Sequence, residues 1–208
     1  MATHYILDTS ALFPKRGKNY GQWDVTGFQK GIEALEEIEL LFTKGIVSCV
    51  PQMLEELEAA RRTIEYAITQ VGEGATTNAY YSLFSQMRDQ CHESIYEWGK
   101  ERGLKKEIGK YAHHWTRRHN QHLDKRKLGG KLETDKHLIT ATIVRGLEGE
   151  ACLVTRDRDL RESFKATLVD VIQGGALQEH FPRLFSIYHF ESDRKKPLTR
   201  GEPYSLQP

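Results

Sequence analysis

The sequence predicts an α/β protein in which a parallel sheet is flanked by helices. Short apolar segments rich in strand formers recur along the chain, and segments with helical apolar spacing separate them. Acidic residues follow several of the apolar segments directly. Strands that alternate with helices favour a parallel sheet, because each crossover connection must return over one face of the sheet.

The first sixty residues predict two units in which a strand is followed by a helix. The strand formers of the first unit stop at Asp8, whose side chain suits the start of a helix. Gly45 ends the helix of that unit, and Pro51 begins the helix of the second. The expected elements are a strand over 3–7, a loop over 14–27, a helix up to Gly45, a strand over 46–50 and a helix from Pro51.

The middle of the chain lacks strand signals and predicts a helical insertion at about 70–130. Two long polar stretches with helical spacing lie between about 76 and 127, with breaks near Gly99 and Gly103. We therefore expect a single domain over 1–190 that carries this insertion.

The last third of the chain predicts a return to alternating helices and strands. Thr134 is suited to cap a helix that begins at Asp135 and continues to Gly149. The further expected elements are a buried strand over 151–155, a short helix after Asp157, a strand over 165–172, a helix over 176–183 and a flexible tail over 191–208.

Four acidic residues stand where a parallel sheet brings them together. Asp8 and Asp157 each follow a predicted strand. Glu56 lies on the helix after the second strand, and Asp135 opens a later helix. These acids converge because the carboxyl ends of parallel strands meet at one edge of the sheet. Clustered carboxylates repel one another, and a bound Mg²⁺ or Mn²⁺ ion removes that repulsion.

Some of these acids have an alternative role or a competing neighbour. Helix capping alone accounts for Asp8 and Asp135, because free amides and the helix dipole favour carboxylates in a first turn. Glu55 competes with Glu56, since adjacent helix residues point about 100° apart. In the same way, Asp159 competes with Asp157 for the position after the third strand.

The four acids lie in the segments YILDTSAL, VPQMLEELE, ETDKHLITATIV and CLVTRDRDL, which occur in this order. Together these segments resemble the PIN-domain family of metal-dependent nucleases. In that family a strand ending in Asp-Thr/Ser, a Glu-Leu pair in a helix, an Asp that opens a later helix and a Thr-x-Asp after the next strand supply the metal site. The resemblance spans about 1–60 and 130–185, and it implies a PIN-like fold.

The resemblance also implies an endoribonuclease that hydrolyses RNA phosphodiester bonds with Mg²⁺ or Mn²⁺ and leaves a 5′-phosphate and a 3′-hydroxyl. Glu56 either binds the metal or orients the attacking water in this scheme. The implied catalytic and metal-binding acids are Asp8, Glu56, Asp135 and Asp157, with Asp159 as the alternative metal ligand. The implied supporting residues are Thr9, Ser10, Glu55 and Thr155.

The insertion carries the positive charge of the chain. Residues 99–131 contain eleven Lys or Arg against three Asp or Glu, a balance of +8, whereas the remainder carries 19 basic and 26 acidic residues, a balance of −7. Such a surface suits a phosphate backbone, and Tyr111 and Trp115 are candidates for stacking on bases. The expected RNA-binding residues are Lys105, Lys106, Lys110, Arg117, Arg118, Lys125, Arg126 and Lys127.

The basic and histidine-rich composition of the insertion is also compatible with roles that involve no RNA. A solvated two-helix arm is the alternative to RNA binding for the lysines, because charged helix faces keep proteins in solution. A structural zinc site is disfavoured, since no cysteine lies at finger-like spacing from the histidines. The histidines in question are His113, His114, His119 and His122.

The composition is that of an ordinary globular protein, with 38% hydrophobic and 28% charged residues. No window approaches the roughly 18 apolar residues of a membrane helix, and the N-terminal residues lack a secretory-signal pattern. Three scattered cysteines imply no disulfide framework. We therefore expect a cytoplasmic protein with no membrane partner.

A structured RNA such as a tRNA precursor, cut at its 5′ side, is a candidate substrate, because the compact protein-only tRNA 5′-maturases also insert a helical protrusion into a PIN domain. The Thr-Arg-Asp-Arg-Asp-Leu segment resembles general PIN nucleases more than those maturases, so the sequence leaves the RNA substrate open. The alternatives are a toxin-type PIN ribonuclease paired with an antitoxin, a non-catalytic RNA-binding PIN module and a structure-specific DNA nuclease. The sequence leaves open whether the chain forms a homo-oligomer or binds a regulatory protein.

Overall fold

The computed structural model describes residues 2–13, 22–99, 102–123, 125–174, 185–191 and 198–206, without the side chains of 125–128, 185, 191, 205 and 206. Six strands of this part form one sheet in the order β2-β1-β3-β4-β5, with β6 paired to β4. The strands are β1 (Thr3–Leu7), β2 (Gly45–Ser48), β3 (Ala151–Val154), β4 (Phe185–Glu191), β5 (Thr199–Arg200) and β6 (Tyr204–Leu206). The expected α/β class with a mostly parallel sheet is confirmed.

Strands β1 and β3 lie side by side in the middle of the sheet and run parallel. Every residue of β3 is buried, which explains why its sequence is a continuous apolar run rather than an alternating one. Leu7 pairs with Val154, so the two strands end level with each other. The segments that follow them therefore emerge next to each other at the same edge of the sheet.

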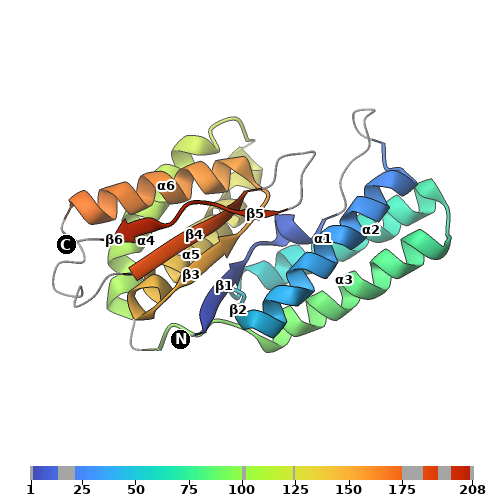
Figure 1. Ribbon diagram of the computed structural model, residues 1–208. Helices are drawn as coiled ribbons and strands as arrows, with labels where there is room; N and C mark the ends of the chain where they lie inside the picture. The colour runs from blue at the N-terminus through green and yellow to red at the C-terminus, as the bar shows by residue number, and fades with distance from the viewer. Residues whose placement is uncertain are drawn as a thin grey trace.

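The helices form two groups in Figure 1, with α4, α5 and α6 on the left and α1, α2 and α3 on the right. Helix α5 packs along β1, β3 and β4, and α4 packs against both α5 and α6. Helix α1 packs against α3 and β2. The helices are α1 (Val25–Lys44), α2 (Met53–Val71), α3 (Ala75–Glu93), α4 (Arg102–His119), α5 (Lys125–Glu148) and α6 (Arg158–Gln173), with a short 3-10 helix, η1 (Thr9–Leu12), after β1.

The turn from α1 into β2 requires glycine. A Cβ atom on Gly45 would lie 2.3 Å from the carbonyl oxygen of Thr3, the residue that Gly45 pairs with in β1. No side chain fits at that distance, and glycine therefore permits the first parallel pairing of the sheet. The sequence prediction that α1 ends at Gly45 is confirmed.

One apolar core extends from the sheet into the α1–α3 group. The ring of Tyr80 on α3 meets the ring of Phe28 on α1 edge to face, with centroids 5.2 Å apart. The Tyr80 hydroxyl donates a hydrogen bond to the carbonyl oxygen of Leu12 in η1. This buried contact ties the segment that follows β1 to α3.

The predicted helices of the middle segment are present as α3 and α4, with a break between them that contains Gly99. Helix α4 is not a projecting arm, however. It buries Ile108, Ala112 and Thr116 against its neighbours. Packing between α5 and α6 leaves one face of α4 for solvent, which explains its polar sequence.

Two sequence predictions for the second half of the chain are wrong. The helix predicted to begin at Asp135 begins at Lys125, so the Thr134 hydroxyl caps nothing and donates to the carbonyl oxygen of Gly130 at 3.3 Å. The strand predicted over 165–172 belongs to α6, because its buried residues Phe164, Leu168 and Val171 follow helical spacing. The β-branched residues between them suggested a strand.

The C-terminal prediction also differs from the structure. The sequence predicts a flexible tail over 191–208, yet Thr199–Arg200 and Tyr204–Leu206 form strands that pair with β4. The sequence pattern does not predict strand β4 itself. The helix expected over 176–183 lies outside the described residues.

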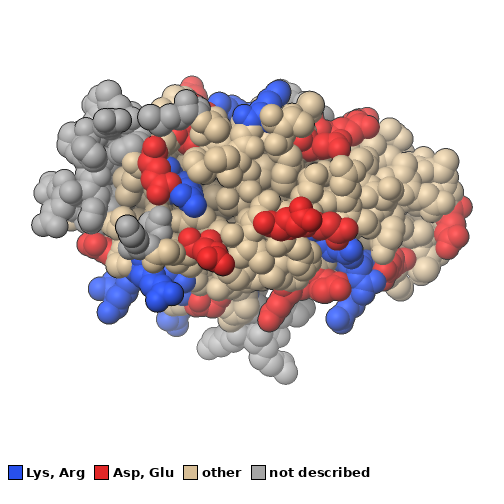
Figure 2. Space-filling view, turned by 90° about the horizontal axis from the view of Figure 1, so that it is seen from below, with Lys and Arg blue, Asp and Glu red and all other residues tan. Residues whose placement is uncertain are grey.

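The face of the molecule in Figure 2 carries acidic and basic side chains in separate small groups. The described residues on this face therefore offer no continuous basic surface. Within the described part of the chain, none of the helices has the length and apolarity needed to cross a membrane.

Candidate active site

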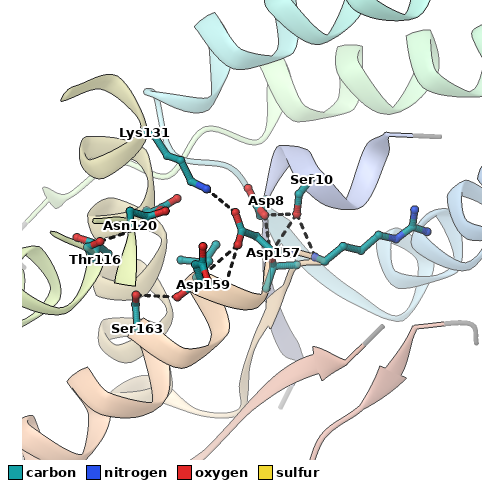
Figure 3. A network of polar contacts seen from close by, with 12 residues as sticks. Asp8, Ser10, Thr116, Asn120, Lys131, Asp157, Asp159 and Ser163 are labelled. Atoms are coloured by element: carbon teal, nitrogen blue, oxygen red, sulfur yellow. Dashed lines mark hydrogen bonds and ion pairs between the residues drawn. The ribbon is translucent and has the colours of Figure 1, made fainter. Parts of the chain in front are cut away.

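A cluster of acidic side chains lies at the carboxyl ends of β1 and β3. Asp8 follows β1, and its backbone amide donates to the carbonyl oxygen of Val154 at the end of β3, at 3.0 Å. Thr155 and Asp157 follow β3 in turn. Level strand ends thus bring two sequence-distant segments together, as Figure 3 shows.

Asp8 is buried beneath two hydroxyl groups. Its carboxylate is 5% exposed, and its Oδ2 atom accepts hydrogen bonds from Thr155 Oγ1 at 2.5 Å and from Ser10 Oγ. Burial raises the pKa of Asp8, although the hydrogen bonds from Ser10 and Thr155 act in the opposite direction. The side chain makes no capping hydrogen bond to η1, so capping does not account for this acid.

Asp135 projects from the interior of α5 rather than from its first turn, so a capping role fails here as well. It is 4% exposed, and its Oδ2 atom accepts a hydrogen bond from Asn120 Nδ2 at 3.3 Å. Burial raises the pKa of Asp135 well above its usual range, and the nearby negative charge of Asp8 raises it further. Asp135 and Asp8 are therefore close enough for the charge of one to affect the pKa of the other.

Asn120 is not among the residues that the sequence predicts for the site. It follows α4, is fully buried, and its Nδ2 atom also donates to the carbonyl oxygen of Thr116 at 2.9 Å. The contact with Asp135 depends on how α4 packs against α5. A polar residue after a helix gives no sequence signal for such a long-range contact.

Glu56 faces the cluster, whereas Glu55 is exposed to solvent. Burial raises the pKa of Glu56, and the negative charge of Asp8 adds to that effect. The nearby hydroxyls of Thr134 and Thr9 act in the opposite direction. Of the two glutamates that the sequence left open, Glu56 is the one that the fold brings to the acids.

Asp157 caps the N-terminus of α6. Its Oδ1 atom accepts hydrogen bonds from the backbone amides of Asp159 at 2.8 Å and Leu160 at 3.3 Å. Its Oδ2 atom lies 2.6 Å from Nζ of Lys131. Burial raises the pKa of Asp157, but the hydrogen bond and charge of Lys131, together with the two amides, outweigh it and lower the pKa. Asp157 is thus a stably ionised acid.

Asp159 lies on a different side of the turn. Its carboxylate is 3.3 Å from Nε2 of His122, which belongs to the segment after α4. Helix α6 begins at Arg158, so the side chain of Asp159 leaves the helix in a different direction from that of the capping residue Asp157. Asp157 rather than Asp159 therefore neighbours Asp8 and Asp135.

Lys131 stands among the acids, although the sequence predicts it only as part of the basic segment. Burial alone would lower the pKa of its ammonium group, but the hydrogen bond and charge of Asp157, then the charges of Asp135 and Asp8, raise it. One ammonium group faces four carboxyl groups here. The negative charge of the cluster is only partly compensated.

The donor chemistry of the cluster fits a hard divalent cation such as Mg²⁺ or Mn²⁺, because all the ligand atoms are carboxylate or hydroxyl oxygens. The raised pKa values of Asp8, Glu56 and Asp135 indicate negative charge that a cation would relieve. Within the described residues, however, no three His, Cys, Asp or Glu side chains already form a metal-binding geometry. Lys131 occupies Oδ2 of Asp157, so a metal there requires the ammonium group to move.

The expected RNA-binding residues divide into three groups. Lys105, Lys106 and Lys110 line a cleft between α4 and α5. Arg117 is exposed on α4, whereas the guanidinium of Arg118 lies over the Trp115 ring, 5.0 Å from its centroid. The side chains of Lys125, Arg126 and Lys127 lie outside the described residues.

Trp115 is engaged in packing rather than free to stack on a base, contrary to expectation. Its indole Nε1 atom donates to Asp170 of α6 at 2.6 Å, and His119 stacks on its ring. His122 pairs with Asp159. His119 and His122 therefore make separate contacts, one with the Trp115 ring and one with a carboxylate of α6.

Comparison of the chain with models of protein families, with curated proteins and with solved structures finds no match. The features that bear on function are therefore the acidic cluster, the basic cleft and the four acidic segments.

Proposed function

We propose that this chain is a Mg²⁺- or Mn²⁺-dependent endoribonuclease with a PIN-like fold. The observation that carries the proposal is the convergence of Asp8, Glu56, Asp135 and Asp157 around the ends of β1 and β3. Four buried or half-buried carboxyl groups with one ammonium group among them are unfavourable for stability alone. Their gathering is explained by a cationic ligand, which the four sequence segments also imply.

The metal, when bound, supplies an activated water and stabilises charge that develops on the phosphoryl oxygens. Asp8 and Asp135 are the proposed principal ligands. Ser10 and Thr155 orient Asp8 through their hydroxyl groups. Glu56, at the edge of the cluster, holds or orients the attacking water, and Asp157 fixes the position of Lys131.

We also propose a role for Lys131 in the reaction itself. Its ammonium group is free to turn from Asp157 toward a scissile phosphate, because a lysine side chain has several rotatable bonds and compact positive charge. Such a group would stabilise the negative charge that increases during phosphoryl transfer. The expected product termini are a 5′-phosphate and a 3′-hydroxyl, as the resemblance to PIN nucleases implies.

We further propose a structured RNA, such as a tRNA precursor, as the substrate and the cytoplasm as the compartment. The basic residues of α4 support an RNA substrate, because a phosphate backbone is bound chiefly by such side chains. All three cysteines are buried and free, as is usual in a reducing compartment. A regulatory protein or a second copy of the chain remains a compatible partner.

A non-catalytic RNA-binding module is the second candidate, and Lys131 is the observation that favours it. An ammonium group that permanently neutralises Asp157 would replace a metal ion instead of making room for one. The two candidates differ in whether added Mn²⁺ stabilises the protein. A catalytic site binds Mn²⁺ and is stabilised by it, whereas a site whose acids are neutralised by Lys131 does not bind the ion.

The test is incubation of the purified chain with labelled tRNA precursor, messenger RNA and flap DNA in Mg²⁺, Mn²⁺ or EDTA, with Asp8→Asn as the inactive control. We expect metal-dependent cleavage of the precursor by wild type alone. Cleavage of messenger RNA only would favour a toxin-type ribonuclease, and cleavage of flap DNA only a DNA nuclease. RNA binding without cleavage of any substrate would favour the non-catalytic module.

A further inference from the structure

A cleft lies between α4 and α5, apart from the acidic cluster. Its volume is about 580 Å³, within the range of small-ligand sites in proteins. The lining residues are Arg102, Lys105, Lys106, Gly109, Lys110, His113, Lys136, His137 and Thr140. Among the described residues this lining holds five Lys or Arg and no Asp or Glu.

The two helices build this cleft through regular spacing. On α4 the lining residues recur three or four positions apart from Arg102 to His113, which places them on one face. On α5, Lys136 and Thr140 are four apart and share a face in the same way. Lys136 points about 100° around the helix from Asp135, so α5 separates the cleft from the acids.

The positive charge in the cleft is only partly neutralised within the protein. Glu133 pairs with Lys136 at 2.5 Å, but within the described part of the chain no carboxylate pairs with Lys105, Lys106 or Lys110. Burial lowers the pKa of Lys105, and the positive charges of Lys136 and Arg102 lower it further, whereas the negative charge of Glu133 acts in the opposite direction. Lysines that repel one another inside a concave surface favour an anion between them.

His137 lines the cleft from α5 and contains an unpaired polar atom. The residue is 6% exposed, and its Nδ1 atom, which has no solvent-exposed surface, lacks a hydrogen-bond partner within the described residues. Its other nitrogen, Nε2, lies 3.6 Å from the carboxylate of Glu133. Buried polar atoms in native proteins are nearly always paired. Because Nδ1 has no exposed surface, a ligand in the cleft reaches this atom only if the imidazole ring turns.

Gly109 leaves one wall of the cleft open. No heavy atom lies within 4 Å of the position that a Cβ atom would take there. Gly109 shares the lining face of α4 with Lys105, Lys106 and Lys110, so a side chain at this position would narrow the cleft. Glycine is unfavourable inside a helix, and a larger side chain here would occupy the open space.

We propose that the α4–α5 cleft binds a phosphate group of a nucleic acid, either a terminal phosphate or an internal phosphodiester. The lysines and Arg102 of the lining supply the positive charge that a phosphate requires. This proposal deepens the proposed function, on which it rests for the choice of RNA as the source of the phosphate. The cleft anchors the RNA on one side of α5 while the acids act on the other.

The test separates the shape of the cleft from its charge. Gly109→Leu fills the open wall, keeps every lysine and favours the helix. The matched control is Gly103→Leu, on the same helix, also in open surroundings but not part of the lining. Lys105→Gln/Lys110→Gln removes charge, and its matched control is Lys30→Gln/Lys44→Gln on α1, where both lysines are exposed.

The probes are fluorescent RNA decamers with a 5′-phosphate or a 5′-hydroxyl, titrated by fluorescence anisotropy with the full chain in EDTA. Gly109→Leu and Lys105→Gln/Lys110→Gln should each raise Kd at least about tenfold, the effect of losing one charged hydrogen bond. Both controls should bind as wild type does. A loss confined to the 5′-phosphorylated decamer assigns the cleft to a terminal phosphate, and an equal loss with both decamers assigns it to an internal phosphodiester.

Wild-type affinity in Gly109→Leu, with α-helical circular dichroism unchanged, would overturn the proposal even if the lysine variant bound weakly. That outcome would leave a diffuse basic surface as the source of RNA affinity. Because EDTA prevents metal-dependent cleavage, the binding result does not depend on whether the acids are catalytic. Cleavage is measured in a separate experiment with added Mg²⁺ or Mn²⁺. Failure of the phosphate-binding proposal can therefore be told apart from failure of the proposed nuclease function.

Discussion

The ammonium group of Lys131 lies 2.6 Å from Oδ2 of Asp157, inside the cluster that also contains Asp8 and Asp135. A lysine in this position is a built-in counter-charge for acids that are too crowded to be stable alone. It also competes with any divalent cation for the same carboxylate oxygen. Metal affinity and stability without metal are therefore expected to oppose each other at this residue.

Lys131→Met tests this competition. Methionine keeps the length of the side chain and removes its charge, so in EDTA the acids lose their counter-charge and the protein is destabilised by about 1–3 kcal/mol. The lower part of this range applies because the lysine and Asp157 side chains remain 31% and 23% exposed. In Mn²⁺ the same variant should gain more stability than wild type and need less metal for half-maximal cleavage.

Thermal denaturation in EDTA and in increasing Mn²⁺ measures both effects of Lys131→Met. Lys136→Met is the matched control, because its partner Glu133 is an exposed residue that does not belong to the cluster. An unchanged metal requirement in Lys131→Met would show that the ammonium group does not compete for the site.

Asp135→Asn tests the electrostatic strain in the cluster through pH. The folded-state pKa of Asp135 is raised by burial and by neighbouring carboxylates, so its ionisation destabilises the folded protein as pH rises through that pKa. Asparagine carries no charge, so the variant is not destabilised by ionisation at this position. In EDTA, the variant should therefore melt above wild type at pH 8 and close to it near pH 4, where wild-type Asp135 is already protonated.

The matched control for Asp135→Asn is Asp159→Asn, whose carboxylate pairs with His122 outside the cluster. Melting temperatures of the three proteins between pH 4 and pH 8 provide the comparison. Asp135→Asn should also abolish cleavage in Mg²⁺. Lower stability of Asp135→Asn than of wild type at pH 8 would contradict the inferred charge repulsion.

Asn120→Ala tests whether the end of α4 positions Asp135. The variant loses two hydrogen bonds of a buried amide, which should lower stability by about 1–3 kcal/mol. It should also lower kcat about tenfold with little change in KM, because Asp135 no longer has a fixed orientation. Thr116→Val is the control, since it removes a buried hydroxyl that bonds only to α4 carbonyl groups. Equal kinetic effects of the two variants would assign Asn120 a purely structural role.

The positions of Asp8 and Asp157 could be inferred from sequence because each lies just after an apolar strand. Strand ends are local signals, and neighbouring parallel strands bring such residues together without further information. The choice of Glu56 over Glu55 required the rotation of α2 about its axis, which the sequence does not determine. The structure supplies it through the burial of Glu56.

Lys131 and Asn120 could not be inferred, because their contacts depend on where α5 begins and how it meets α4. Gly129 and Gly130 suggest a break in that helix, yet α5 continues through both. Packing against the sheet and α4 outweighs the low helix propensity of the two glycines. The early start of α5 is what brings Lys131 to the acids.

Asp157→Asn addresses the acid that holds Lys131. Asparagine caps a helix about as well as aspartate, so the hydrogen bonds to the amides at the start of α6 can persist. The ion pair with Lys131 is lost, and the ammonium group then turns to Asp8 and Asp135, whose charges already raise its pKa. We expect Asp157→Asn to retain the fold, to lower cleavage, and to raise the Mn²⁺ concentration for half activity by about tenfold, because the metal must displace lysine from the principal ligands.

Asp159→Asn keeps the Asp157–Lys131 pair and should resemble wild type. Metal titrations of both variants under identical salt conditions provide the measurement, and a larger effect of Asp159→Asn would show that the acids of this turn have been assigned in the wrong order.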